Sequence, residues 1–294
     1  MNPPSSSKPL GGVVAMVTGA SRGVGKGIAL GLGEAGATVI VTGRSESSGA
    51  SATLSGPAGP LSGTIDQTAD EVSGKGGEGI AIRCDHGDDD DVARLFGAVQ
   101  ERFGRLDLLV NNVFAIPRTL TKPFWELPLS TWDEMFRVGL RSHYVASVFG
   151  VRMMLAAPPR AGVSDEVPRS RGLIVNVSSF GGRHYAINVP YGAGKAALDR
   201  MTRDQARELR PHDITAVAIY PGIVRTERVL ANVDGLSFDL SDAESPLFSG
   251  RAVAALAADP KVIERTGKVL VVAELAHEYD FVDEDGRRPK SLRT

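Results

Sequence analysis

Short apolar runs alternate with stretches of helical period along most of the chain, and this alternation limits the possible folds most strongly. The runs are rich in β-branched residues and show little polar alternation, which is typical of parallel strands covered by helices on both faces. The predicted strands are 13–18, 38–43, 79–83, 107–111, 173–178, 214–220 and 268–272. The predicted helices are 25–35, 67–73, 90–103, 132–155, 192–209 and 250–258. The alternation predicts an α/β protein with a doubly wound parallel sheet of about seven strands.

Composition narrows the class of protein further. Of the 294 residues, 42% are hydrophobic, and 33 basic residues against 35 acidic ones leave a net charge of −2. This balance indicates neither a nucleic-acid partner nor a membrane-surface partner. No apolar run reaches the length of a membrane span, and no signal-peptide pattern opens the chain. The single cysteine, Cys84, excludes an intrachain disulfide and fits a reducing compartment, so we expect a cytoplasmic protein.

Two connections are longer than such a fold normally needs. Residues 45–63 are rich in Ser, Gly and Ala, and residues 158–171 in Pro, Arg and Ser. Neither composition can bury a core of its own, so both are predicted to be surface loops rather than linkers between domains. We therefore expect a flexible tail at 1–11 and a single domain over 12–294.

A glycine-rich segment, T-G-A-S-R-G-V-G, lies between the first predicted strand and the first predicted helix. Glycines let the backbone turn sharply and approach a pyrophosphate, whose charge is then met by N–H groups and the helix N-terminus. A glycine-rich turn without a ligand is disfavoured, because a strand precedes the motif and a helix follows it. The candidate contacts are Gly19, Ser21, Arg22, Gly23, Val24 and Gly25.

Tyr191 and Lys195 form a Y-x-x-x-K motif at the start of the predicted helix 192–209, one turn apart on one face. A free phenol has a pKa of about 10 and is a poor base at neutral pH. A neighbouring ammonium favours the phenolate, so Lys195, helped by the positive nicotinamide of an oxidised cofactor, is expected to lower the pKa of Tyr191. Tyr191 can then exchange a proton with an alcohol or carbonyl oxygen while a hydride passes to or from a nicotinamide.

The spacing T-G-x-x-x-G-x-G, followed by Y-x-x-x-K, resembles the single-domain type of the short-chain dehydrogenase/reductase family. The resemblance extends along nearly the whole chain. It implies a Rossmann-like fold and an oxidoreductase that interconverts a carbonyl and an alcohol. It also implies a homodimer or homotetramer assembled through the helices 132–155 and 192–209.

The tip of the second predicted strand favours NADP(H) over NAD(H) as the cofactor. An acidic residue there would bind the ribose hydroxyls of NAD, but this chain has Arg44, and Arg22 can approach the same place. Two guanidinium groups suit the oxygens of a 2′-phosphate. The alternative is that Arg44 is an ordinary surface charge, and Glu46 nearby argues against a phosphate.

Further cofactor contacts follow from the family pattern. Asp85, His86 and Asn112 come after the third and fourth predicted strands, and P-G-x-x-x-T comes after the sixth. Main chain at Val224 and the hydroxyl of Thr226 are implied to hold the carboxamide and the pyrophosphate. The residues carried over from the resemblance are Asp85, His86, Asn112, Val138, Pro221, Gly222, Val224 and Thr226.

One of two adjacent serines is expected to bind the substrate oxygen and stabilise charge there. Alignment of the strand residues I-V-N-V-S-S with the family pattern selects Ser179. Counting back from Tyr191 by the usual interval selects Ser178 instead. We prefer Ser179, because the register of a strand varies less than the length of a loop, and we predict catalytic roles for Ser179, Tyr191 and Lys195.

The sequence departs from the family at two places. The family has N-N-A-G after its fourth strand, where this chain has bulkier residues at Val113 and Phe114. Gly139 replaces an asparagine that, in the family, holds a water in a proton relay from the lysine. Glycine still offers a carbonyl and tolerates a helix kink, so the relay could survive. His143 is a candidate substitute, although a histidine on a helix surface is more often packed or solvated.

The resemblance is strongest to one branch of the family, which has a mammalian member and shares this glycine. Residues 227–248 are implied to form a flap over the substrate. An apolar substrate pocket is suggested by Phe114, Phe124, Trp125, Leu230, Val233, Leu236, Phe238, Leu240, Leu247 and Phe248. Some of these residues are expected to belong to the core.

We therefore expect an NADP(H)-dependent oxidoreductase that acts on a small-to-medium apolar carbonyl or alcohol. The alternative is a catalytically weak NADP-binding redox sensor or scaffold protein, which the two departures from the family pattern motivate. An extended-family epimerase is disfavoured because its glycine spacing differs.

Overall fold

Seven parallel strands form the central sheet of the computed structural model, which describes residues 8–47, 54–56, 59–115, 122–158, 170–231 and 239–293. The strands are β1 (Val14–Thr18), β2 (Thr38–Gly43), β5 (Glu78–Arg83), β6 (Leu108–Asn111), β7 (Gly172–Val177), β8 (Ile214–Tyr220) and β9 (Val269–Val271). Their order is β5-β2-β1-β6-β7-β8-β9, with every pair parallel. The predicted doubly wound, Rossmann-like α/β fold is confirmed.

The order of the strands reverses at β1, which pairs with β2 on one side and with β6 on the other. The chain therefore leaves β1 and β6 toward opposite sides, and their carboxyl ends border a crevice. Ligands of open α/β sheets bind outside the carboxyl ends of the strands at such a switch point. The glycine-rich loop follows β1 directly, so it lies at this place.

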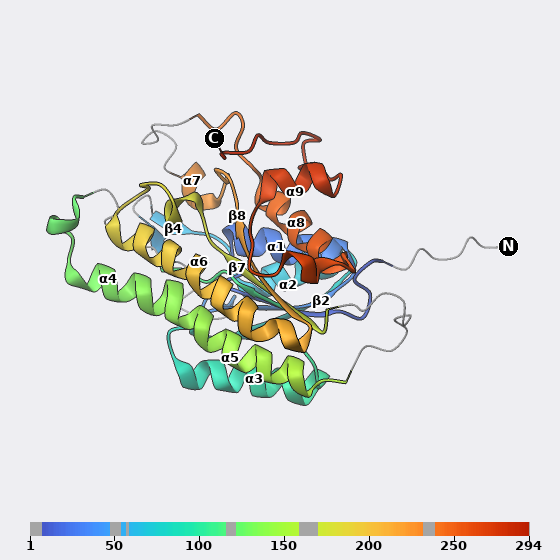
Figure 1. The fold of residues 1–294 in the computed structure, drawn as a ribbon. Coiled ribbons are helices and arrows are strands. Elements are labelled where there is room, and N and C mark those ends of the chain that lie inside the picture. Colours follow the sequence, from blue (N-terminus) through green and yellow to red (C-terminus); the bar gives the residue numbers. More distant parts are fainter. Residues whose placement is uncertain are drawn as a thin grey trace.

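Helices cover both faces of the sheet (Figure 1). One layer contains α1 (Gly23–Glu34), α2 (Ile65–Gly74), α8 (Pro246–Ala258) and α9 (Val272–Glu278). The other contains α3 (Asp89–Phe103), α4 (Leu129–Phe136), α5 (Ser142–Ala156) and α6 (Val189–Leu209). A short helix, α7 (Glu227–Leu230), follows β8.

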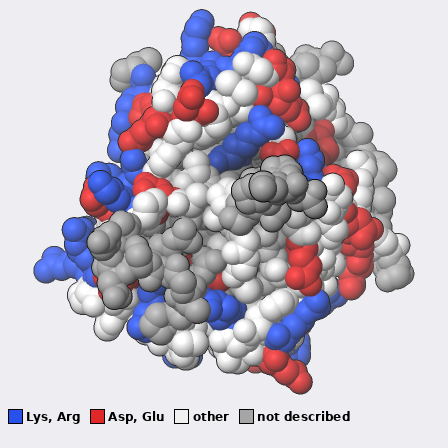
Figure 2. Space-filling view, turned by 90° about the vertical axis from the view of Figure 1, so that its right-hand side faces the viewer, with Lys and Arg blue, Asp and Glu red and all other residues white. Residues whose placement is uncertain are grey.

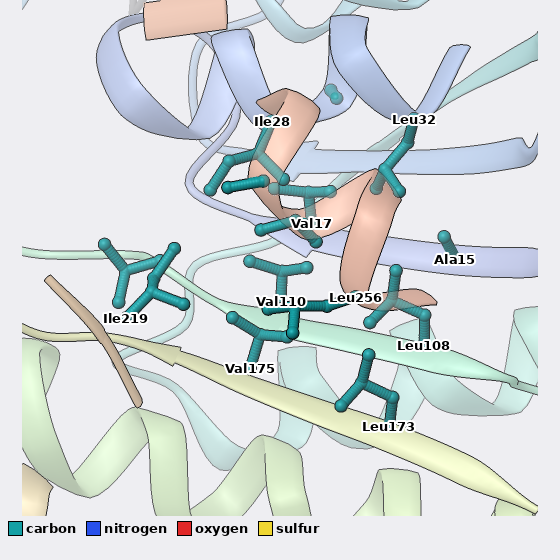
Figure 3. Close-up of a cluster of buried hydrophobic side chains, with 14 of the residues drawn as sticks. Ala15, Val17, Ile28, Leu32, Leu108, Val110, Leu173, Val175, Ile219 and Leu256 are labelled. Carbon is teal, nitrogen blue, oxygen red and sulfur yellow. The ribbon is translucent and has the colours of Figure 1, made fainter. Parts of the chain in front are cut away.

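Alternate residues of the central strands enter the two helical layers, as the pleat of a strand requires. Val17, Val110 and Val175 belong to one buried cluster with Ile28 and other residues of α1, as Figure 3 shows. The adjacent residues Met16, Leu109 and Ile174 belong to the second cluster, with α3, α5 and α6. This two-sided burial explains why the strand sequences are apolar without alternation.

Helices α1 and α8 approach each other through glycines. A Cβ atom on Gly31 would lie 2.7 Å from the Cα atom of Gly250, and one on Gly27 would lie 2.6 Å from Cβ of Pro246. Such distances are shorter than any van der Waals contact, so the two backbones can be this close only without side chains at these positions.

The long connection 45–63 is not wholly irregular, which corrects the prediction of a surface loop. It contains an antiparallel hairpin of β3 (Leu54–Gly56) and β4 (Gly59–Leu61). The hairpin returns the chain to the glycine-rich loop, where Nε of Arg22 donates to the carbonyl of Ser62 over 3.0 Å. Most of the second long connection, 158–171, lies outside the described residues.

The expected boundary of the tail at residue 11 is also wrong in part. Leu10 is buried in the core, and its N–H donates to the carbonyl of Ala35 over 2.9 Å. Nζ of Lys8 donates to the carbonyl of Lys75 over 2.9 Å. The packed part of the chain therefore includes residues 8–11, whereas residues 1–7 are outside the described part.

Charged side chains of both signs are interspersed over the face of the molecule that Figure 2 shows. Many pair at the surface, as Lys75 does with Glu34 at 2.8 Å. Among the described helices, none combines the length and the apolar character that a bilayer crossing requires.

Candidate active site

The loops after four neighbouring strands carry most of the candidate residues. The glycine-rich loop follows β1, Asn112 follows β6, Ser179 follows β7, and residues 221–226 follow β8. Because carboxyl ends of parallel strands lie at one edge of the sheet, the fold brings these segments to one site.

Tyr191 and Ser179 are in direct contact. The hydroxyl of Tyr191 donates to Oγ of Ser179 over 2.8 Å, and the N–H of Gly181 donates to the same Oγ over 3.1 Å. Tyr191 is positioned by the start of α6, where Oδ1 of Asn188 accepts from the N–H of Tyr191 over 2.9 Å. Asn188 caps the helix and Pro190 is in its first turn, and both are start signals that the sequence itself contains.

The neighbouring serine has a different environment. Ser178 is buried, and its Oγ donates to the main-chain carbonyl of Lys195 over 3.4 Å. Of the two serines left open by the sequence, Ser179 is the one that the fold brings to Tyr191.

Lys195 lies on α6 one turn after Tyr191 and is buried. Its Nζ donates to the carbonyl of Val177 over 2.9 Å. Burial lowers the pKa of Lys195 to about 8, and the carboxylate of Asp199 acts in the opposite direction. An ammonium has three N–H donors, so a group at this edge of the sheet can still be bound by Lys195.

The residues of the chain by themselves do not lower the pKa of Tyr191. Burial raises the pKa of Tyr191 above its usual value, and the hydrogen bond with Ser179 opposes this effect. Removing the phenol from water disfavours its charged form, and the ammonium of Lys195 is itself directed to a carbonyl. Tyr191 is therefore a protonated group that can donate.

Asp199 and Tyr220 form a buried pair behind Lys195 that sequence reading missed. Asp199 lies one turn after Lys195 on α6, and the hydroxyl of Tyr220 donates to its Oδ2. A carboxylate in a helix four residues after a buried lysine is a signal that could have indicated this partner. Tyr220, expected to be only strand packing, therefore also has a polar role.

The glycine-rich loop has the backbone that the motif requires. Gly19 has a φ of 67° and Gly23 a φ of 59°, in the left-handed region that favours glycine. A Cβ atom on Gly19 would lie 2.7 Å from the Cα atom of Val113. Nδ2 of Asn112 donates to the carbonyls of Thr18 and Gly19 over 2.9 and 3.0 Å, so Asn112 holds the loop in this shape.

The first turn of α1 is the predicted place for a pyrophosphate. Gly23 begins the helix, and its N–H now donates to Oε2 of Glu227 over 2.9 Å. This N–H therefore binds an anionic oxygen already, which fits the chemistry of a dinucleotide at the loop. Ser21 is buried beneath this turn, and Val24 and Gly25 continue it into α1.

Both arginines that were expected at the tip of β2 lie near it. Nη2 of Arg22 donates to the carbonyl of Gly63 over 2.6 Å and to Oγ of Ser45 over 3.4 Å. Arg44, directly before Ser45, is exposed, with Nη1 3.8 Å from Oδ2 of Asp85. The guanidinium of Arg22 is thus held at Ser45 and Gly63, whereas that of Arg44 lies near the carboxyl group of Asp85.

The residues after β5 differ from each other in orientation. Asp85 is partly exposed and its Oδ1 accepts from the N–H of Gly87 over 2.9 Å. His86 is buried, with Nε2 2.6 Å from Oγ1 of Thr42, and burial lowers its pKa to about 4. The side chain of His86 therefore belongs to the interior, so only its main chain remains for the predicted cofactor contact.

The P-G-x-x-x-T segment lies beside the glycine-rich loop. A Cβ atom on Gly23 would lie 3.5 Å from Cγ2 of Thr226. Oγ1 of Thr226 accepts from the N–H of Val229 over 3.3 Å and caps α7. Glu244 supports the segment from behind: its N–H donates to the carbonyl of Ile223 over 2.7 Å, next to Pro221, Gly222 and Val224.

The expected helix 132–155 is interrupted. A π-helical segment, η2 (Arg137–Arg141), separates α4 from α5 and contains Val138 and Gly139. His143, which was considered as a residue on the helix surface, is fully buried. Its Nε2 lies 2.8 Å from the carbonyl of Val113.

The predicted apolar pocket is corrected in part. Leu247 and Phe248 lie on α8 in the core, because that helix packs on α1 and not over the site. Phe124, Trp125 and Leu230 are exposed. Val233, Leu236 and Phe238 are outside the described residues. The flap was expected over residues 227–248, but helix α8 begins at Pro246, so the segment before it ends at residue 245.

Comparison with known proteins identifies the family to which the chain belongs. The model of the short chain dehydrogenase family matches residues 58–235. Dehydrogenase/reductase SDR family member 1 of Mus musculus is 44% identical over 96% of this chain and 86% of its own length. The human protein of that name is 42% identical over 95% of this chain and 85% of its own. A putative short-chain alcohol dehydrogenase from Sinorhizobium meliloti has a solved structure with a TM-score of 0.70 and 28% identity, covering 90% of this chain and 95% of that one.

These relatives include the branch that the sequence pattern indicated. The family consists of oxidoreductases that use nicotinamide cofactors. The matched segments include those that carry Ser179, Tyr191 and the seven-stranded sheet. The chain therefore belongs to the short-chain dehydrogenase/reductase family.

Proposed function

We propose that this protein is an NADP(H)-dependent carbonyl reductase or alcohol dehydrogenase, with Tyr191 as the acid or base. The observation that carries the proposal is the 2.8 Å hydrogen bond between Tyr191 Oη and Ser179 Oγ, with buried Lys195 one turn away. Two hydroxyl groups that meet in this way can both reach one substrate oxygen.

In the direction of reduction, a bound NADPH would supply a hydride for the carbonyl carbon, and the glycine-rich loop, Asn112 and Thr226 would hold it. Tyr191, whose raised pKa keeps it protonated, gives its proton to the developing alkoxide. Ser179 stabilises the charge on the same oxygen by a hydrogen bond, its Oγ held by the N–H of Gly181. Lys195 stabilises the phenolate that remains by its positive charge.

NADP(H) is proposed over NAD(H) because of Arg44 and Arg22. Replacing Arg44 with alanine should reduce the preference for NADP(H) over NAD(H) by about ten- to a hundred-fold, since a charge-assisted hydrogen bond is lost. The measurement is kcat/KM for each cofactor with one substrate. Arg44→Lys, which keeps the charge without the planar fork, should be intermediate, and an unchanged preference in Arg44→Ala would refute the phosphate site.

Glu227 competes for the same helix end as the cofactor. Its carboxylate accepts from the N–H of Gly23, so a bound pyrophosphate must replace it there. Glu227→Gln should tighten binding of NADPH by about three- to five-fold, because a negative charge at the helix N-terminus is removed. Titration of NADPH fluorescence measures this effect, with Glu208→Gln at the far end of α6 as the control. Weaker or unchanged binding would contradict it.

We also propose one domain over most of the chain, cytoplasmic in location, that forms a homodimer or homotetramer through α5 and α6. The exposed apolar side chains Tyr144 and Leu155 on α5 support such an interface. Substrates are expected to be apolar and small to medium in size.

The test of the proposed function is nicotinamide absorbance with a panel of ketones, aldehydes and secondary alcohols. Turnover of at least one substrate by the wild type, with NADP(H) preferred, is expected. Cofactor binding without turnover of any substrate would instead favour the redox sensor or scaffold protein.

A further inference from the structure

The two places where this sequence departs from its family are in contact. Phe114 follows β6, and Gly139 is buried in the π-helical segment η2. A Cβ atom on Gly139 would lie 2.6 Å from both Cδ2 and Cε2 of Phe114. The ring therefore occupies the space that any side chain at position 139 would need.

The same ring contacts both members of the Y-x-x-x-K motif. It meets the ring of Tyr191 edge to face, with centroids 5.6 Å apart and an interplanar angle of 90°. Nζ of Lys195 lies 4.9 Å from the centroid of Phe114, within the range of a cation–π interaction. Among aromatic arrangements, the edge-to-face geometry is a favourable one.

The backbone that carries Phe114 is fixed on two sides. The N–H of Val113 donates to Oγ1 of Thr18 over 3.2 Å. The carbonyl of Val113 accepts from Nε2 of His143 over 2.8 Å. A carbonyl can only accept, so His143 carries its proton on Nε2, and burial lowers its pKa to about 3. Neutral His143 therefore serves to anchor the loop.

We propose that Phe114 is a positioning residue for Lys195 and Tyr191. Its ring packs against both side chains and fills the space that a side chain at position 139 would need. Gly139, which has no side chain, leaves this space open for the ring. The negative face of the ring stabilises the buried ammonium, and the ring covers that side of the ammonium with apolar atoms. The inference rests on the proposed function, because it concerns the same tyrosine and lysine.

The charge of Lys195 depends on groups from several elements. Asp199 on α6 favours the ammonium, and Tyr220 on β8 is bound to Asp199. His143 on α5 faces the lysine as a neutral group, and Tyr191 lies on the same helix. Phe114 adds to these a contact that favours the charged form without being titratable itself.

The first experiment compares Phe114→Leu with Phe114→Tyr in the direction of alcohol oxidation, where Tyr191 must lose its proton. Leucine keeps the apolar bulk but removes the π face, so Lys195 should be less charged and the phenolate less stable. The rising limb of the pH profile of kcat should move upward by about one pH unit in Phe114→Leu. Phe114→Tyr, which keeps the ring, should restore the wild-type profile.

Identical pH profiles for wild type and Phe114→Leu would overturn the inference, and so would a shift that Phe114→Tyr fails to correct. Failure of the proposed function is a separate result, which would appear as turnover that persists in Tyr191→Phe. If Tyr191→Phe is inactive and the pH profile of Phe114→Leu is not shifted, only the role of Phe114 is refuted.

The second experiment needs no activity. Gly139→Ala should lower the thermal midpoint in the wild-type background, because its Cβ meets the ring of Phe114. The same change in a Phe114→Ala background should cost little, because the space is then open. Additive changes in the two backgrounds would contradict the coupling of the two positions.

Discussion

Tyr191→Phe is expected to reduce kcat by about a thousand-fold with any substrate of the enzyme, because it removes the group that exchanges a proton with the substrate oxygen. The phenylalanine ring keeps the edge-to-face contact with Phe114, and only the hydroxyl that bonds Ser179 is lost. The fold and the binding of NADPH should therefore be retained. Steady-state kinetics, a thermal melt and a fluorescence titration of NADPH measure the three quantities.

The matched control is Tyr144→Phe, which removes a hydroxyl from an exposed tyrosine on α5. It should keep wild-type kcat. If Tyr191→Phe retained more than about a tenth of wild-type kcat, Tyr191 would not be the acid or base, since general acid–base catalysis is worth at least about a hundred-fold.

Gly31→Ala is expected to lower the free energy of unfolding by about 3 kcal/mol, at the upper end of the cost of overpacking. The new Cβ would overlap the backbone of Gly250, and backbone cannot move aside as the end of a flexible side chain can. Helices α1 and α8 would have to separate, which opens the core on that face of the sheet. Urea unfolding measures the change.

The control for Gly31→Ala is Gly97→Ala, in the middle of α3, where an added Cβ would meet no atom within 4 Å apart from its own chain neighbours and the local helix backbone. It should leave stability unchanged or raise it by about 0.5–1 kcal/mol, because alanine is the better helix former. Equal effects of the two substitutions would show that the close approach of α1 and α8 does not limit stability.

Local patterns predicted the sheet well. The strands 38–43 and 214–220 were predicted with the bounds that the structure gives, because both are runs rich in β-branched residues and buried on both faces. The glycine-rich loop and the Y-x-x-x-K motif were also visible, because each is contained in a single turn of backbone. Interactions within a few residues leave a readable pattern in the sequence.

What the sequence could not predict depends on contacts between distant segments. Phe114 and Gly139 appeared as two unrelated departures, and only their packing shows that one requires the other. Phe248 was expected at the substrate pocket, but α8 turns it into the core. The upward shift of the Tyr191 pKa was not predicted, because it comes from burial, which a motif does not reveal.

The most direct test of hydride transfer with Tyr191 as the acid follows the label from NADPH that is deuterated at C4, prepared separately for each face of the ring. With a ketone that the substrate panel identifies, one of the two deuterated forms of NADPH should give an alcohol that carries deuterium on its carbinol carbon when the wild type is used. Tyr191→Phe should yield almost no labelled alcohol. NADPH oxidation that leaves the carbinol carbon unlabelled from both forms would contradict the account, as would undiminished labelling in Tyr191→Phe.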